Sequence, residues 1–301
     1  MGTSKPIHQM TVPQLEKAFP TDAACMKYLA KHRWPTIVTC PRCGSDQICP
    51  MATMEFKWQC YGCDQDGYRF SVLVGTVFEN TNVGLRTWFR VIYRMLVSKK
   101  GVSAHQIYRE MGFGSYRTAW HMCHRIRAGL ANENFRKLMG IVEVDKAYVG
   151  GKAKNRHWDK WGGGGAISGS GKDIVAGAVS RKGNVVARVI AGVRAKTLET
   201  FVRESVSTKA SLLCTDKWVG YKHLNKEFPQ HETVDHAARQ YVCGAVHTQT
   251  IEGFWSILKR GVVGTYHKVR AKYLPLYAAE FQFRYNNRLN ANISGEAIRG
   301  C

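Results

Sequence analysis

Apolar residues recur at helical spacing through the first part of the chain. Between residues 85 and 97 they fall at positions 85, 88, 89, 92, 95 and 96, which form one stripe along a helix. Two shorter helices are predicted at residues 12–18 and 21–32, and Thr21 is a suitable N-cap for the second. Residues 36–80, between these helices, have short alternating runs such as residues 55–59 and are predicted to form small antiparallel strands.

Two helices with a glycine-containing turn between them come next. Ser103 caps a predicted helix that runs to Met111, and Ser115 caps another that runs to about Leu130. This arrangement resembles a helix-turn-helix, whose second helix enters the major groove of DNA, although an ordinary helical hairpin with a solvated basic face has the same pattern. The expected core face consists of Ala119, Met122, Ile126 and Leu130, and the candidate DNA-facing residues are Tyr116, Arg117, His121, His124, Arg125 and Arg127.

The second half of the chain alternates between strand and helix patterns. Residues 141–148, 173–180 and 185–191 are predicted strands, and residues 181–184 form a suitable hairpin turn between the last two. The elements predicted after them are a helix capped by Thr197, a strand at 211–214, a helical segment from Trp218, a strand at 231–235, and helices at 250–260 and 273–288. This order, β-β-β-α-β-α-β-α, is that of an α/β RNase H-like fold.

Four of the ten cysteines form two Cys-x-x-Cys pairs. Cys40-Pro-Arg-Cys43 is followed, after 16 residues, by Cys60-Tyr-Gly-Cys63. Two such pairs on facing hairpins present the four thiolates that Zn²⁺ binds in tetrahedral geometry, with no open position for catalysis. Cys49 is a rival ligand, but it lacks a partner at the right spacing. We therefore expect a structural Zn²⁺ site.

These patterns divide the chain into four regions. We expect an N-terminal helical segment at residues 1–35, a small zinc ribbon at 36–80, a helix-turn-helix-like helical region at 81–135 and an RNase H-like domain at 136–301.

The charge of the chain indicates a polyanionic partner. Lys and Arg number 44 against 22 Asp and Glu, which gives a formal net charge of +22. Such an excess favours binding to nucleic acid through the release of counterions, although it also aids solubility. The N-terminal residues contain no apolar run, and no segment approaches the length that spans a bilayer. We therefore expect a cytoplasmic, nucleoid-associated protein and exclude a membrane protein or a secreted disulfide scaffold.

Three acidic residues stand out because of the elements that carry them. Asp145 lies within the first predicted strand of the α/β region, Asp216 follows a short apolar strand, and Glu252 begins a late helix. In an RNase H-like sheet these elements are neighbours, so the three carboxylates are expected to converge. Carboxylates can hold two Mg²⁺ or Mn²⁺ ions about 3.5–4 Å apart, which bind the attacking and leaving oxygens in phosphoryl transfer. Each residue alone has a simpler explanation, as a turn residue or a helix-start acid.

Several neighbours of these carboxylates are secondary candidates. Lys259 lies seven residues after Glu252 on the same helix face, where it and Arg260 could meet phosphate. Glu143 shares a strand face with Asp145 and is a candidate supporting group. Lys146 is expected to point to the opposite face, away from the metals. The glycine-rich segment at 162–172 lacks the residues of a phosphate-binding loop.

Long strings of residues carry a family resemblance. They are Trp34-Pro35 ahead of Cys40-Pro-Arg-Cys43-Gly44, VEVDKAYVGGK (142–152), TDKWVGYKHL (215–224), VHTQTIEGFWSILKRGVVGTYHKV (246–269) and FRYNNR (283–288). Over nearly its whole length the chain resembles the zinc-ribbon DDE transposases of the bacterial insertion-sequence group related to the eukaryotic Merlin elements.

The resemblance implies a catalytic domain in which Asp145 is the first metal ligand, Asp216 the second and Glu252 the third. Gln249 stands where many members have Asn, so it competes with Glu252 for the third place. Thirty-five residues separate Asp216 from Glu252, a spacing common among DDE enzymes. Lys146 and Ala147 depart from the family, which usually has an acidic residue and Thr there.

The expected activity is divalent-metal-dependent DNA cleavage and strand transfer at the ends of an insertion sequence. The expected partners are the terminal inverted repeats and the target DNA, bound by a homodimer or higher oligomer. A nuclease of the same fold that cuts without joining is one alternative. A domesticated DNA-binding regulator without catalysis is the other.

Overall fold

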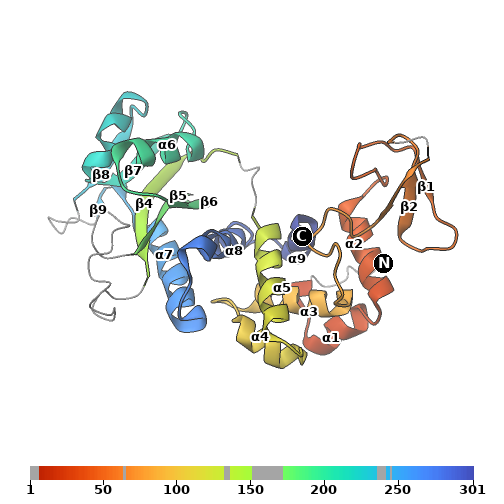
Figure 1. Cartoon of the computed structure of the whole chain (residues 1–301). Coiled ribbons are helices and arrows are strands. Elements are labelled where there is room, and N and C mark those ends of the chain that lie inside the picture. Colours follow the sequence, from red (N-terminus) through yellow and green to blue (C-terminus); the bar gives the residue numbers. More distant parts are fainter. Residues whose placement is uncertain (1–6, 64–65, 132–135, 151–171, 236–241, 245) are drawn as a thin grey trace. The chain divides into compact units, whose positions relative to one another are not determined.

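The computed structural model describes residues 7–63, 66–131, 136–150, 172–235, 242–244 and 246–301. The chain divides into two compact units, which are described separately. The first combines Met1–Ala131 with Leu289–Cys301, and the second is Asn132–Arg288 (Figure 1).

The first unit is built around a strongly amphipathic helix. The predicted apolar stripe forms one side of α3 (Leu85–Val97), where Trp88, Phe89 and Ile92 are buried. Before it come α1 (Val12–Ala18) and α2 (Asp22–Arg33), and the side chain of Thr21 caps α2 as predicted. The C-terminal helix α9 (Ile293–Gly300) packs against α2 and α3.

The two helices of the predicted DNA-binding segment are also present. They are α4 (Ala104–Met111) and α5 (Tyr116–Gly129), and the side chains of Ser103 and Ser115 cap them. Gly112 ends α4 with a left-handed φ of 64°, a conformation that costs glycine little. The predicted core face of α5 is buried, at Ala119, Met122, Ile126 and Leu130.

A small antiparallel sheet follows α2 in the same unit. Its strands are β1 (Ile48–Pro50), β2 (Lys57–Cys60) and β3 (Tyr68–Ser71), in the order β1-β2-β3. Trp58 lies against Trp34 and Phe70, with ring centroids 5.2 and 5.8 Å away. The apolar core of this sheet is small because few residues form it. A bound metal is therefore expected to contribute to the stability of the sheet.

The second unit contains a mixed five-stranded sheet. Its strand order is β6-β5-β4-β7-β8, in which β4, β7 and β8 are parallel, while β5 is antiparallel to β4 and β6. The strands are β4 (Ile141–Val149), β5 (Asp173–Ser180), β6 (Val185–Ile190), β7 (Leu212–Asp216) and β8 (His231–Val234). This order is the one expected of an RNase H-like sheet.

Helices cover both faces of this sheet (Figure 1). One face packs on α6 (Ala195–Ser205), and the other packs on α7 (Gln249–Gly261) and α8 (Leu274–Asn286). A Cβ atom at Gly177 of β5 would lie 2.5 Å from the Trp255 ring, so glycine permits the close approach of α7. This approach brings α7 over the middle of β4 and β5.

Some local features differ from the expected pattern. Helix α6 begins at Ala195, after Arg194 and without a side-chain cap, so the predicted cap at Thr197 is wrong. A short ribbon of β9 (Val242–Cys243) and β10 (Val246–His247) precedes α7 and was not anticipated. The glycine-rich segment lies largely outside the described residues.

Candidate active site and metal centres

The four predicted cysteines form one cluster at the small sheet. Their Sγ atoms all lie within 4.8 Å of one another. The distance from Cys40 to Cys63 is 3.5 Å, and that from Cys43 to Cys60 is 3.7 Å. Four sulfurs at a Zn–S distance of about 2.3 Å in a tetrahedron are about 3.8 Å apart, so the cluster fits a structural Zn²⁺ ion.

The surroundings favour the thiolate form that zinc requires at Cys40, whereas burial raises the pKa of Cys60, and the neighbouring thiols and burial raise that of Cys63. Burial acts to raise the pKa of the Cys40 thiol, but hydrogen bonds from the backbone N–H groups of Cys43 and Arg42 and from the thiols of Cys63 and Cys60 together lower it to about 7. Cys49 is exposed and lies outside the cluster, where its Sγ contacts the carbonyl of Pro50. The rival ligand is therefore not used.

Two of the three predicted catalytic carboxylates lie on adjacent parallel strands. Val144 of β4 is paired with Thr215 of β7, and Asp145 and Asp216 are the next residues on the two strands. Burial raises the pKa of Asp145, and the negative charge of Asp216 raises it further. The two carboxylates thus lie side by side on neighbouring strands, and a cation bound there would stabilise the ionised form of both.

Each of these aspartates has a specific partner. The indole Nε1 of Trp255, on α7, donates to Asp145 Oδ2 at 3.1 Å. The Lys146 ammonium donates to Asp216 Oδ2 at 2.7 Å. The buried Asp216 Oδ1 has no hydrogen-bond partner among the residues that the structure describes. Asp216 therefore retains one oxygen that is available to a further ligand.

The contact of Lys146 with Asp216 corrects an expectation. Strand alternation predicts that Lys146 points away from Asp145, and the stem of Lys146 does begin on the opposite face of β4. Its long side chain nevertheless turns towards the end of β7, where the ammonium meets the Asp216 carboxylate. Alternation fixes the direction of Cβ only, and four further bonds allow lysine to reach the neighbouring strand.

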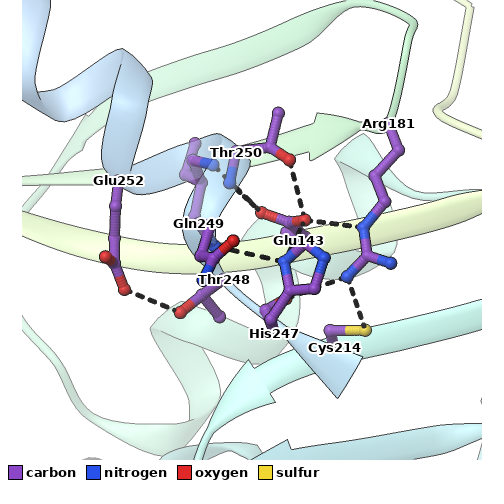
Figure 2. Close-up of polar contacts among 9 residues, drawn as sticks. Glu143, Arg181, Cys214, His247, Thr248, Gln249, Thr250 and Glu252 are labelled. Carbon is purple, nitrogen blue, oxygen red and sulfur yellow. Dashed lines mark hydrogen bonds and ion pairs between the residues drawn. The ribbon is translucent and has the colours of Figure 1, made fainter. Parts of the chain in front are cut away.

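A third acidic residue, Glu143, is completely buried and attaches α7 to β4. Its Oε2 accepts from the backbone N–H groups of Thr250 and Ile251, at 2.7 and 3.0 Å. Its Oε1 accepts from Arg181 Nε at 2.7 Å and from the Thr250 hydroxyl at 2.9 Å, and His247 Nδ1 lies 3.2 Å away (Figure 2). The carboxylate thereby satisfies orphan N–H groups at the positive end of the helix.

The third predicted ligand, Glu252, lies on the exposed side of the same helix turn. Its carboxylate accepts from the Thr248 hydroxyl at 2.9 Å and lies on the other side of the α7 N-terminus from Glu143 (Figure 2). Gln249 is exposed one turn earlier, and Lys259 is exposed two turns later. Among the described residues, the four cysteines are the group of three or more such side chains placed to hold a metal ion, so Glu252 does not form such a group with the two aspartates.

The predicted DNA-facing residues of α5 differ in exposure. Tyr116, Arg117 and His121 are exposed. Arg125 is half-buried, donates to the carbonyl of Glu79 at 2.8 Å and lies over the Trp88 ring. The other two candidates, His124 and Arg127, are buried. The exposed N-terminal half of α5 is therefore the part that can reach a ligand.

Comparison with known proteins places this geometry in a family. The ISXO2-like transposase domain matches residues 137–286, and the transposase zinc-ribbon domain matches residues 20–66. The chain belongs to the ISXO2-like transposase family. It is also 27% identical, over 278 residues, to an uncharacterized protein in transposable element ISH50 of Halobacterium salinarum, covering 89% of this chain and 92% of the relative.

The family assignment confirms the resemblance noted in the sequence, and the two matched domains agree with the structure. The zinc-ribbon match contains all four clustered cysteines, and the transposase match contains the five-stranded sheet, α7 and α8. Transposase and zinc-ribbon domains indicate DNA as the partner. No helix in the described part of this transposase is long and apolar enough to cross a bilayer.

Sequence reasoning missed several residues that support the candidate site. Arg181 looks like a hairpin-turn residue, and Thr250 and Trp255 look like ordinary members of a helix. Arg181 and Thr250 contact Glu143, and Trp255 contacts Asp145. One sequence signal could have indicated these contacts. Glu143 is an acidic residue on a strand that is otherwise rich in valine, and a buried carboxylate is expected to have a hydrogen-bonding or charged partner.

Replacement of Glu143 should loosen α7. We expect Glu143→Gln to lower the free energy of unfolding of the second unit by about 2–4 kcal/mol, because Arg181 loses its buried counter-charge. Urea denaturation followed by circular dichroism measures this change. The matched control is Glu204→Gln, since Glu204 is half exposed in its ion pair with Arg188 and should contribute less than about 1 kcal/mol. Equal effects of the two substitutions would refute the role given to Glu143.

Proposed function

We propose that this ISXO2-like transposase cuts and joins DNA strands at the ends of an insertion sequence, with Mg²⁺ or Mn²⁺ bound by Asp145, Asp216 and Glu252. The observation that carries the proposal is the pairing of β4 with β7, which puts the two aspartates next to each other in a transposase domain. Helix α7, which carries Glu252, packs on β4 and on β5, the neighbour of β4 on its other side.

The two aspartates fit a divalent cation. Asp145 is largely buried beside a second carboxylate, and the buried Asp216 Oδ1 lacks a partner among the described residues. Hard cations such as Mg²⁺ prefer carboxylate oxygens of this kind. When bound, two such ions would stabilise the attacking and leaving oxygens of an in-line displacement at phosphorus. For the third ligand we favour Glu252 over Gln249, because a carboxylate binds Mg²⁺ more strongly than an amide.

The chain's own residues orient the metal ligands and the DNA. Trp255 holds one oxygen of Asp145 through its indole N–H, which fixes the rotation of that carboxylate. Glu143 binds the first turn of α7 and thereby sets the position of Glu252 relative to β4. Lys259 and Arg260 are exposed at the far end of α7, where their charges can bind the phosphates that flank the cleaved bond.

DNA recognition is assigned to the first unit. Tyr116, Arg117 and His121 lie exposed near the N-terminus of α5, as in a recognition helix, and we propose that they contact the terminal inverted repeats. Arg125 takes a lesser part, because its guanidinium already binds the Glu79 carbonyl. Since two element ends must be joined, the active form is proposed to be a dimer or higher oligomer on DNA.

A strand-transfer assay with Mg²⁺ separates this proposal from its two rivals. Joined products support a transposase, whereas hydrolysis alone supports a nuclease of the same fold. Binding without cleavage supports a DNA-binding regulator. The placement of the partly buried Asp216 beside the largely buried Asp145 favours the catalytic alternatives, since a regulator has no need to hold two acidic side chains together away from solvent.

Asp216→Asn tests the active site most simply. We expect it to reduce strand cleavage and joining by a factor of about 1000 or more, since the neutral amide is a poor ligand for a hard cation, while DNA affinity stays unchanged. A radiolabelled terminal-repeat duplex reports both. The matched control is Asp235→Asn, because Asp235 follows the neighbouring strand β8 and pairs with the exposed Lys217. Cleavage at the normal rate by the Asp216 variant would overturn the site assignment.

Arg117→Ala tests the proposed recognition helix. We expect weaker binding to the terminal repeat and a salt dependence whose slope, in log affinity against log salt concentration, is smaller by about 1, as for one lost phosphate contact. Fluorescence anisotropy at several salt concentrations measures the slope. Arg90→Ala is the control, because Arg90 lies in the same unit but is paired with Glu16. An unchanged slope in the Arg117 variant would exclude this residue from the DNA interface.

A further inference from the structure

Lys146 places a lysine ammonium inside the candidate active site. Its side chain is only 8% exposed, and its Nζ lies 2.7 Å from Asp216 Oδ2. The ammonium also lies 4.8 Å from the ring centroid of Trp218 and 5.7 Å from that of Tyr221, so two aromatic faces stabilise it. A buried ammonium requires a counter-charge, and Asp216 supplies it.

This lysine changes the charge that the site offers to a metal. When both are ionised, Asp145 and Asp216 carry two negative charges, and the Lys146 ammonium offsets one of them while it is paired with Asp216. The same ammonium occupies Oδ2 of Asp216, which leaves Oδ1 as the oxygen without a described partner. One oxygen of the Asp216 carboxylate is therefore already bound by Lys146. A divalent ion that binds the other oxygen is repelled by the positive charge of the ammonium a few ångströms away.

We propose that Lys146 is a tethered cation that competes with the divalent metal for Asp216, and so holds the site in a state of weak metal affinity before DNA binds. This inference rests on the proposed role of Asp216 as a metal ligand. Lys146 is here a positioning residue, since it acts through Asp216. The DNA phosphates that the enzyme cleaves are the natural anions to draw the ammonium from Asp216, because they bring negative charge to the same place.

A purely structural ion pair would behave differently. If Lys146 only stabilised the fold, its removal would lower the stability and leave metal affinity equal or reduced. If it competes with metal, its removal must increase metal affinity even though the protein becomes less stable. Metal binding in the absence of DNA thus separates the two roles without any measurement of activity.

The experiment measures Mn²⁺ binding to the zinc-loaded full-length chain by the electron paramagnetic resonance signal of free Mn²⁺. We expect Lys146→Met, which keeps an unbranched side chain only one atom shorter and removes the charge, to bind Mn²⁺ about tenfold more tightly than the native protein. Mn²⁺ should also raise the melting temperature of this variant more than that of the native protein. Lys146→Arg, which keeps the charge, should bind as weakly as the native chain.

Two further variants complete the test. Asp216→Asn identifies the fraction of Mn²⁺ binding that belongs to this site. Lys217→Met is the matched control, because Lys217 is the next residue after Asp216 but is 69% exposed and paired with Asp235, so its loss should leave Mn²⁺ affinity unchanged. Equal or weaker Mn²⁺ binding by the Lys146→Met protein, or the absence of any binding that depends on Asp216, would overturn the inference. A failure of strand transfer alone would instead count against the proposed function.

Discussion

The arrangement of the candidate site depends on the buried carboxylate of Glu143. A fully buried charge is costly, and this one is tolerated because Arg181, the Thr250 hydroxyl and two backbone N–H groups of α7 all bind it. These bonds join the first turn of α7 to the first half of β4. Because Asp145 lies two residues along the same strand, the attachment also sets the position of α7 relative to the metal-binding edge of the sheet. The contact of Trp255 with Asp145 and the glycine at position 177 follow from the same close approach.

Much of the fold could be predicted, because its signals are local. The apolar stripe of α3, the serine caps of α4 and α5 and the hairpin turn at residues 181–184 depend on residues close together in the chain. The cysteine cluster follows from two short spacings that suit only one geometry around a metal. The pairing of Asp145 with Asp216 required one further step, the order of strands in an RNase H-like sheet, and the parallel register of β4 and β7 agrees with it.

The remaining features depend on contacts between distant parts of the chain. Glu143 and Thr250 are 107 residues apart, and no periodicity links them. The reach of Lys146 to Asp216 depends on the rotamers of a long side chain and on the aromatic rings that receive it, which strand alternation does not encode. Helix α9 is short, and its buried residues Ile293, Ala297 and Ile298 do not indicate which surface they cover. It belongs to the first unit, although the expected RNase H-like domain extended to residue 301 and no helix was predicted after residue 288.

The central claim is that β4, β7 and the start of α7 together hold the catalytic metal. Metal-directed backbone cleavage tests it most directly, with Fe²⁺ in place of Mg²⁺ on the zinc-loaded protein bound to terminal-repeat DNA, and with the fragments mapped by mass spectrometry after ascorbate and peroxide are added. The account predicts cleavage in three places, near Asp145, near Asp216 and within residues 249–252. Cleavage at the two strands with α7 intact, or cleavage confined to other parts of the chain, would contradict it.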